Sequence, residues 1–180
     1  MALSARNVRP SVAAVDAMDS EEFVAALGSA VEHSPWVARE AWRRRPFGSL
    51  AALQLAFEAA LQSAPRDRRL ELLRAHPELA GREAAAGELT DASAREQRAA
   101  RLDRLTTEEA AALRDLGDRY RARFGFPFIA CVREHSVESL LAWGQARLAR
   151  DPEHEEATAL AEVGKIVGLR LRELTAGDAA

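Results

Sequence analysis

Cysteines and closely spaced histidines are almost absent from this sequence, and their scarcity excludes several kinds of site. A single cysteine among 180 residues, Cys131, rules out internal disulfides and a cysteine-rich zinc site. The four histidines are far apart, and none stands in the His-Glu-x-x-His spacing of a zinc enzyme. No glycine-rich phosphate loop is present either. The sequence therefore predicts neither a metal site nor a phosphate-binding loop.

Long hydrophobic runs are also missing. No segment reaches the roughly 20 apolar residues that a transmembrane helix needs. The apolar stretch at residues 12–15 is too short for a signal peptide, and the last residues carry no Ser-Lys-Leu peroxisomal signal. We therefore expect a cytoplasmic protein that does not contact a membrane.

The charge is nearly balanced, with a net charge of −3. One of the 25 basic residues is a lysine, Lys165, and the others are arginines spread along the chain. This balance gives no strong attraction toward nucleic acid or lipid headgroups. The aromatic residues are scattered, so they offer no stacking platform for bases. With 48% hydrophobic and 29% charged residues, the composition is typical of a soluble globular protein.

Apolar residues recur at intervals of three and four through most of the chain, which predicts an all-α protein. Capping residues, prolines and glycines divide this pattern into about eight helices. We expect them at residues 20–31, 35–45, 50–61, 66–75, 90–102, 107–124, 137–150 and 152–174. Because the helices are short and interrupted, we expect a single-domain irregular bundle with a central substrate pocket over residues 19–175. A loosely ordered or weakly helical segment (1–18) and a short tail (176–180) should flank it.

One histidine stands at a break between two expected helices. Pro77 disfavours the α conformation at His76, so the helix over residues 66–75 should end there. The C-terminal end of a helix dipole favours a protonated imidazole, which makes His76 a candidate general acid. A histidine that only caps the helix fits the same pattern, and this stretch alone does not decide between the two.

A second candidate is a group of polar residues on one helical face. Ser93, Glu96 and Gln97 are spaced at i, i+3 and i+4, so their side chains project together. A hydroxyl, a carboxylate and an amide in this arrangement could bind a small polar heterocycle. The Ser-x-x-Glu spacing is equally that of a capping box at the start of a helix.

Two further features border the expected core. Arg170 lies beside the apolar stripe of the last helix, where it could hold a carboxylate by two hydrogen bonds or serve a structural role. Residues 124–132 are apolar but interrupted by Gly125 and Pro127, so they either fill a gap between helices or offer free backbone groups to a ligand. Cys131 within this run is expected to be unreactive packing.

Taken in order, these elements resemble the 2-oxo-4-hydroxy-4-carboxy-5-ureidoimidazoline (OHCU) decarboxylase family. The resemblance covers about residues 19–174. It rests on five motifs in the family's order and spacing: His76-Pro77-Glu78-Leu79-Ala80-Gly81, Ser93-x-x-Glu96-Gln97, Leu102-x-x-Leu105-Thr106, Tyr120-Arg121-x-Arg123-Phe124-Gly125-Phe126-Pro127-Phe128-Ile129, and Val163-x-x-Ile166-x-x-x-Arg170-Leu171. Two N-terminal stretches look like the family too: Ser34-Pro35-Trp36-Val37 and Arg45-Pro46-Phe47.

The resemblance implies a homodimer that decarboxylates OHCU, an anionic ureidoimidazoline, to (S)-allantoin in urate catabolism without a cofactor or metal. In that family the residues matching His76, Glu96 and Arg170 are catalytic, with the histidine as acid/base. The residues that contact the substrate match Pro77, Ser93, Gln97, Phe128, Ile129, Ala130, Cys131 and Val132.

Two positions depart from the family pattern. Family members usually have glycine where this chain has Arg101, and often asparagine where it has Gly117. Two other functions stay open beside the decarboxylase. One is a helical acid–base enzyme acting on another ureide or cyclic amide, and the other is a non-catalytic helical interaction protein. Ligand binding separates the last case, because a scaffold should not bind allantoin-like heterocycles.

Overall fold

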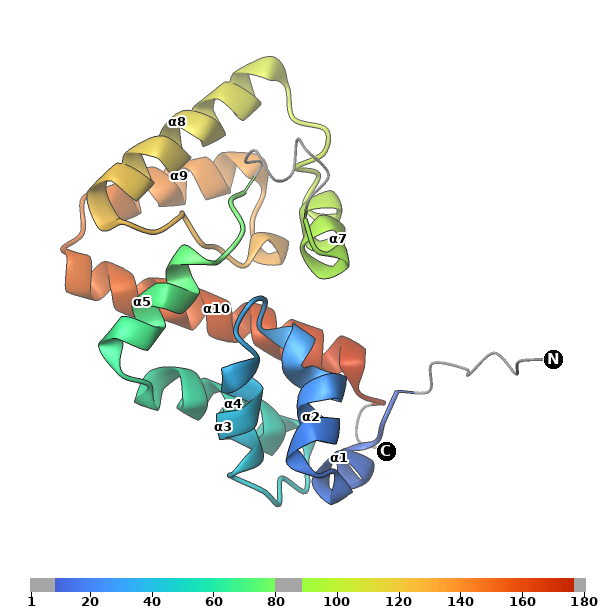
Figure 1. Cartoon of the computed structure of the whole chain (residues 1–180). Helices are drawn as coiled ribbons and strands as arrows, with labels where there is room; N and C mark the ends of the chain where they lie inside the picture. Colours follow the sequence, from blue (N-terminus) through green and yellow to red (C-terminus); the bar gives the residue numbers. More distant parts are fainter. Residues whose placement is uncertain (1–8, 80–88, 177–180) are drawn as a thin grey trace. The chain divides into compact units, whose positions relative to one another are not determined.

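The computed structural model describes residues 9–79 and 89–176, and this part of the chain is built from helices without any strand (Figure 1). The predicted all-α class is therefore confirmed. The α-helices are α1 (Val12–Ala17), α2 (Ser20–Leu27), α3 (Pro35–Trp42), α4 (Leu50–Ser63), α5 (Arg66–Arg74), α7 (Asp91–Ala99), α8 (Thr107–Phe124), α9 (Val137–Leu148) and α10 (Pro152–Leu174). Two short 3-10 helices join them, η1 (Gly28–Ala30) and η2 (Val132–Glu134).

The described residues fall into two compact units. The first contains those up to Ser63 and from Val167 onward, and the second contains those between Ala64 and Ile166. Helix α10 contributes its first part to the second unit and its last part to the first. The single domain expected over residues 19–175 stays a prediction.

Most helix ends follow capping residues that the sequence displays. The Asp19 carboxylate accepts hydrogen bonds from the N–H groups of Glu21 and Glu22, both at 2.9 Å, at the start of α2. The Thr106 hydroxyl accepts one from the Glu109 N–H at 3.1 Å, and the Glu109 carboxylate accepts one from the Thr106 N–H at 2.8 Å, which together form a capping box at the start of α8. Gly125 ends α8 with a φ of 76°, in the left-handed region that glycine adopts at low cost. These local signals are confirmed.

The N-terminal segment is more ordered than the sequence indicates over its described residues. Ser11 caps α1, and the side chains of Val12 and Val15 are buried. The Asp16 carboxylate accepts a hydrogen bond from the Phe47 N–H at 2.7 Å, which ties α1 to the chain before α4. Helix α1 therefore belongs to the core of the first unit, where only loose or weakly helical structure was predicted.

Arg101 follows α7 in a left-handed conformation, with a φ of 61°. This backbone favours glycine, which explains why a glycine suits the position. We expect Arg101→Gly to raise the free energy of unfolding by about 1 kcal/mol, measured by urea denaturation. The matched control is Arg98→Gly inside α7, which should lower the same quantity by about 1 kcal/mol. If both variants lowered the free energy of unfolding equally, the backbone at Arg101 would not be strained.

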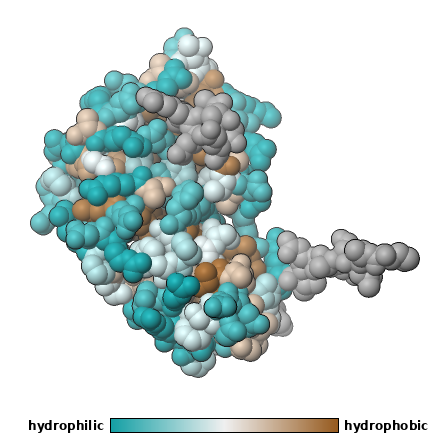
Figure 2. Space-filling view, viewed as in Figure 1, coloured by the Kyte–Doolittle hydropathy of each residue, from teal (hydrophilic) through white to brown (hydrophobic). Residues whose placement is uncertain are grey.

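The surface is mainly polar. Figure 2 shows hydrophilic residues over most of the visible face, with hydrophobic residues between them. Among the described residues, Leu55 on α4 is the one large hydrophobic side chain that is exposed, at 64%. None of the helices in the described ranges is long and apolar enough to cross a membrane.

Candidate functional site

His76 lies directly after α5 in the second unit, as the sequence predicts. The helix ends at Arg74, and the His76 N–H still donates a hydrogen bond to the Leu73 carbonyl at 3.3 Å. Pro77 is buried and His76 is half-buried. The helix break is therefore confirmed, whereas Ala80 and Gly81 of the same motif lie outside the described residues.

Helix α7 carries the predicted polar face. Thr90 caps this helix, because its hydroxyl accepts a hydrogen bond from the Ser93 N–H at 3.3 Å. Ser93 and Gln97 therefore lie within the helix and are buried, and Glu96 is half-buried. The alternative interpretation of Ser93 and Glu96 as a capping box is wrong, because Thr90 provides the cap.

The same helix meets the segment after His76. The Gln97 side-chain amide donates a hydrogen bond to the Glu78 carbonyl at 3.2 Å. Helix α7 also packs against η2, which follows the apolar run. Three motifs that are distant in the sequence therefore come together in the second unit.

Residues 126–132 are all buried and have no regular secondary structure before η2 begins at Val132. The predicted interruption of the helix by Gly125 and Pro127 is thus confirmed. A buried irregular segment must satisfy its backbone N–H and C=O groups outside a helix or sheet. Two charged side chains, Arg147 and Glu162, supply part of that hydrogen bonding.

Arg147 on α9 is the larger of these two groups and is fully buried. Its guanidinium donates hydrogen bonds to the Ile129 carbonyl at 2.7 Å, to the Glu155 carboxylate at 2.9 Å and to the Tyr120 hydroxyl at 3.0 Å. The Tyr120 hydroxyl donates in turn to Glu155. The guanidinium carbon also lies 4.3 Å from the centre of the Trp143 ring, within cation–π range.

Burial shifts both members of the Arg147–Glu155 pair toward their neutral forms. It lowers the pKa of Arg147 to about 10. It also raises the pKa of Glu155 to about 8, with the nearby Glu162 charge adding to the rise. The direct hydrogen bonds between the two groups oppose these shifts, because they favour the charged forms. The pair is therefore held in place by its hydrogen bonds, at the cost of removing both groups from water.

Glu162 on α10 binds the backbone of the apolar segment at Cys131, two residues after the Ile129 carbonyl that Arg147 binds. Its carboxylate accepts a hydrogen bond from the Cys131 N–H at 2.8 Å and pairs with Lys165 at 2.9 Å. Lys165 also pairs with Glu134 in η2 at 2.7 Å. These interactions connect α10 to both the apolar segment and the short helix that follows it.

The pKa of the Cys131 thiol lies well above that of an ordinary thiol. Burial, followed by the charges of Glu134 and Glu162, raises its pKa to about 11 from 9.0. The folded state therefore retains this proton more tightly than the unfolded chain, and the stability it contributes below pH 9 is lost as the pH rises to 11. Thiolate ultraviolet absorbance should show a midpoint near pH 11 in the folded protein and near 9 in urea. Equal midpoints would contradict a buried Cys131.

Glycine is required where α8 and α9 approach each other. A Cβ atom at Gly144 on α9 would clash with the Leu116 side chain and lie 3.1 Å from Cζ of Phe128. The absence of a side chain therefore allows Phe128 to pack against α9, where its ring centre is 5.0 Å from the Arg147 guanidinium carbon.

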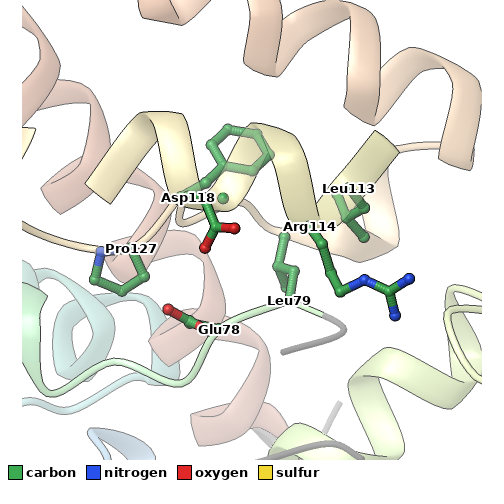
Figure 3. Close-up of a pocket in the computed structure, with 8 residues that line it drawn as sticks. Glu78, Leu79, Leu113, Arg114, Asp118 and Pro127 are labelled. Carbon is green, nitrogen blue, oxygen red and sulfur yellow. The ribbon is translucent and has the colours of Figure 1, made fainter. Parts of the chain in front are cut away.

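A pocket lies where two of the predicted motifs meet (Figure 3). It has a volume of about 200 Å³ and is lined by Glu78, Leu79, Leu113, Arg114, Gly117, Asp118, Pro127 and Phe128. In Figure 3 the carboxylates of Glu78 and Asp118 face each other, whereas the Arg114 side chain points away from them. A Cβ at Gly117 would have no heavy atom within 4 Å, so this position leaves the pocket open. Phe128 is the predicted substrate-binding residue among those lining the pocket.

Arg170 belongs to the first unit, near the end of α10. It is 4% exposed, and its guanidinium lies 3.6 Å from the Glu32 carboxylate, which is also buried. The prediction that Arg170 borders the core is confirmed. The structure leaves its catalytic role a prediction, as it does for His76 and Glu96.

Sequence reasoning missed the charged residues that hold the apolar segment. Glu155 and Glu162 lie on the buried face of α10. One signal could have identified Arg147: it follows Leu140 and Gly144 at intervals of four and three, so it lies on their buried face. Within the described ranges, no three histidine, cysteine, aspartate or glutamate side chains are placed to hold a metal ion.

Comparisons with known proteins place the chain among related sequences. The family model for OHCU decarboxylase matches residues 16–172. A 2-oxo-4-hydroxy-4-carboxy-5-ureidoimidazoline decarboxylase of Halalkalicoccus jeotgali is 42% identical, over 93% of this chain and 93% of its own length. One of Mus musculus is 42% identical, over 89% of this chain and 90% of its own length. The crystal structure of an (S)-allantoin synthase matches with a TM-score of 0.70 and 29% identity, over 92% of this chain and 54% of that one.

Proposed function

Because the chain belongs to the OHCU decarboxylase family, as its motifs predict, we propose that it decarboxylates OHCU to (S)-allantoin in urate breakdown. The observation that carries this proposal is the meeting of three polar or irregular motifs in the second unit. The segment after His76, the buried face of α7 and the apolar segment lie together there. A small anionic heterocycle needs such a combination of a proton donor, fixed polar side chains and backbone hydrogen-bonding groups.

The chemistry follows from the substrate. The bond between the ring carbon and its carboxylate breaks, and CO₂ leaves without the bonding electrons. This electron pair stays on the ring carbon and is delocalised into the adjacent carbonyl or imine. His76, in its protonated form, then donates a proton to one face of the neighbouring ring carbon, which carries the ureido group and becomes the stereocentre of allantoin. The hydroxyl on the carbon that lost CO₂ releases its proton and becomes a carbonyl. The substrate supplies its own electron sink, so the proposal includes no cofactor and no metal.

The remaining predicted residues bind and orient the substrate in this proposal. Arg170 pairs with an anionic group, and Glu96 accepts a hydrogen bond from the ring hydroxyl or the ureido group. Further contacts come from Pro77, Ser93, Gln97 and residues 128–132. The positions of Ser93 and Gln97 support these assignments, because both are buried on one face of α7 and the Gln97 amide donates to the Glu78 carbonyl beside Pro77.

A coupled assay tests the proposal. Urate is converted freshly by urate oxidase and hydroxyisourate hydrolase, the protein is added, and optical activity at the allantoin band is followed. Rapid appearance of the (S) enantiomer would support the decarboxylase. Slow formation of racemic allantoin, equal to the control without protein, would refute it. Binding of allantoin without turnover would instead indicate an enzyme for another ureide or cyclic amide, and no binding would indicate a helical interaction protein.

The oligomeric state and location complete the proposal. We infer a homodimer from the family resemblance, and the cytoplasmic location stays a prediction. Light scattering on the purified protein would give twice the 19.6 kDa chain mass for a dimer. A mass equal to one chain at the concentrations of the assay would contradict it.

A further inference from the structure

Two buried side chains contact the backbone of the apolar segment on either side of one residue. Arg147 donates a hydrogen bond to the carbonyl of Ile129, and Glu162 accepts one from the N–H of Cys131. Ala130 lies between these two bonds and is 2% exposed. Within the described residues, the N–H and C=O of Ala130 have no hydrogen-bond partner. Buried backbone groups are rarely left unpaired, so a partner outside the chain is the physical expectation for these two.

The two side chains are themselves fixed on several sides. Arg147 donates to three oxygens at once, those of Ile129, Glu155 and Tyr120, and the planar fork of a guanidinium holds these bonds in a fixed geometry. Glu162 is held by Lys165, which also pairs with Glu134 at the end of the segment. Hydrogen bonds to charged groups are roughly twice as strong as neutral ones, so both contacts restrain the backbone firmly.

We propose that Arg147 and Glu162 are positioning residues that hold residues 128–132 so that the backbone groups of Ala130 bind the substrate. The proposal rests on the proposed decarboxylase function, because it names what fixes the substrate-binding segment of that site. Neither side chain touches the reacting atoms in this arrangement. Their removal should therefore weaken substrate binding while leaving the proton donor in place.

The first test is Glu162→Gln in the full-length protein. The amide oxygen can still accept from the Cys131 N–H, but the charge and the ion pair with Lys165 are lost. We expect the KM for OHCU to rise about tenfold with kcat changed by less than about twofold, the pattern of lost binding that is common to ground state and transition state. Glu153→Gln on the exposed start of α10 is the matched control and should leave both constants unchanged.

A second variant keeps the proposal testable if Glu162→Gln does not fold. Tyr120→Phe removes one hydroxyl from the Arg147 contacts and keeps the ring that packs against Phe128 at 5.2 Å. The KM should rise about threefold with kcat retained. Circular dichroism confirms that each variant is folded. The nitrogen-15 amide signal of Ala130 supplies a readout besides activity, since it should shift on addition of (S)-allantoin to the wild type and shift less in either variant.

The outcomes separate the two proposals. A wild type without OHCU decarboxylase activity refutes the function and the positioning role with it. An active wild type whose KM is unchanged in both folded variants overturns the positioning role and leaves the function intact. If Glu162→Gln does not fold, the KM of Tyr120→Phe decides, and an unchanged value overturns the proposal.

Discussion

Replacing His76 by alanine is expected to lower kcat for OHCU decarboxylation by about 10²–10⁴-fold, the usual contribution of a general acid or base. The structure places His76 after the end of α5, half-buried and next to the buried Pro77. Its backbone N–H bond to Leu73 does not depend on the imidazole, so the helix break should survive the substitution. The residual product should also lose its enantiomeric excess, because no group would deliver the proton to one face.

His154→Ala is the matched control for this experiment. His154 is an exposed residue on α10 that pairs with Asp151 at 2.9 Å, so its loss should leave kcat within about twofold of the wild type. Thermal unfolding of both variants would show whether either change affects the fold. Full activity and full stereoselectivity in His76→Ala would remove His76 from the mechanism, while the family membership would stand.

The largest expected loss of stability comes from Arg147→Leu. This change removes the donors to three buried oxygens, on Ile129, Glu155 and Tyr120, whichever protonation state Glu155 adopts. Breaking one member of a buried pair typically costs about 3–5 kcal/mol. We therefore expect the free energy of unfolding to fall by about that amount, measured by guanidinium denaturation monitored by circular dichroism.

Arg119→Leu on α8 provides the comparison. Arg119 pairs with Asp115 at 3.2 Å on the surface, and exposed pairs of this kind contribute about 0.3–0.5 kcal/mol. A loss in Arg147→Leu no larger than in Arg119→Leu would mean that the buried network is not a principal source of stability. The double variant Arg147→Leu with Glu155→Leu should recover part of the loss, since it removes the stranded carboxylate as well.

The fold could be predicted where local signals determine it. Asp19 and Thr106 each satisfy N–H groups within their own helix, so the starts of α2 and α8 are encoded within a few residues. The break before His76 is equally local, because Pro77 acts on the residue that precedes it. Helix α1 was harder to predict, because its order depends on the contact of Asp16 with Phe47, about 30 residues away.

In the candidate site, too, the features set by local sequence could be predicted, and those set by distant contacts could not. The shared face of Ser93 and Gln97 follows from helical geometry, and the structure buries both. Glu155 and Glu162 could not be predicted, because glutamates look like surface residues until tertiary contacts pair them. The spacing of Arg147 from Leu140 and Gly144 was the one signal that placed it on a buried face. Arg147, Glu155 and Glu162 are therefore missing from the sequence-based candidates. Arg101 shows the reverse case, in which one dihedral angle explains the glycine that the family usually has, and nothing in the structure explains the arginine of this chain.

Gly144 limits which substitutions the second unit can accept. Any larger residue there would push against Leu116 and Phe128. The displaced Phe128 ring would pass the change on to the pocket wall and to the substrate-binding segment that it begins. A single added methyl group on α9 would thus alter ligand affinity without touching a polar residue. Libraries built to change substrate preference should therefore keep glycine at position 144 and introduce bulk at Gly117, where the space is open.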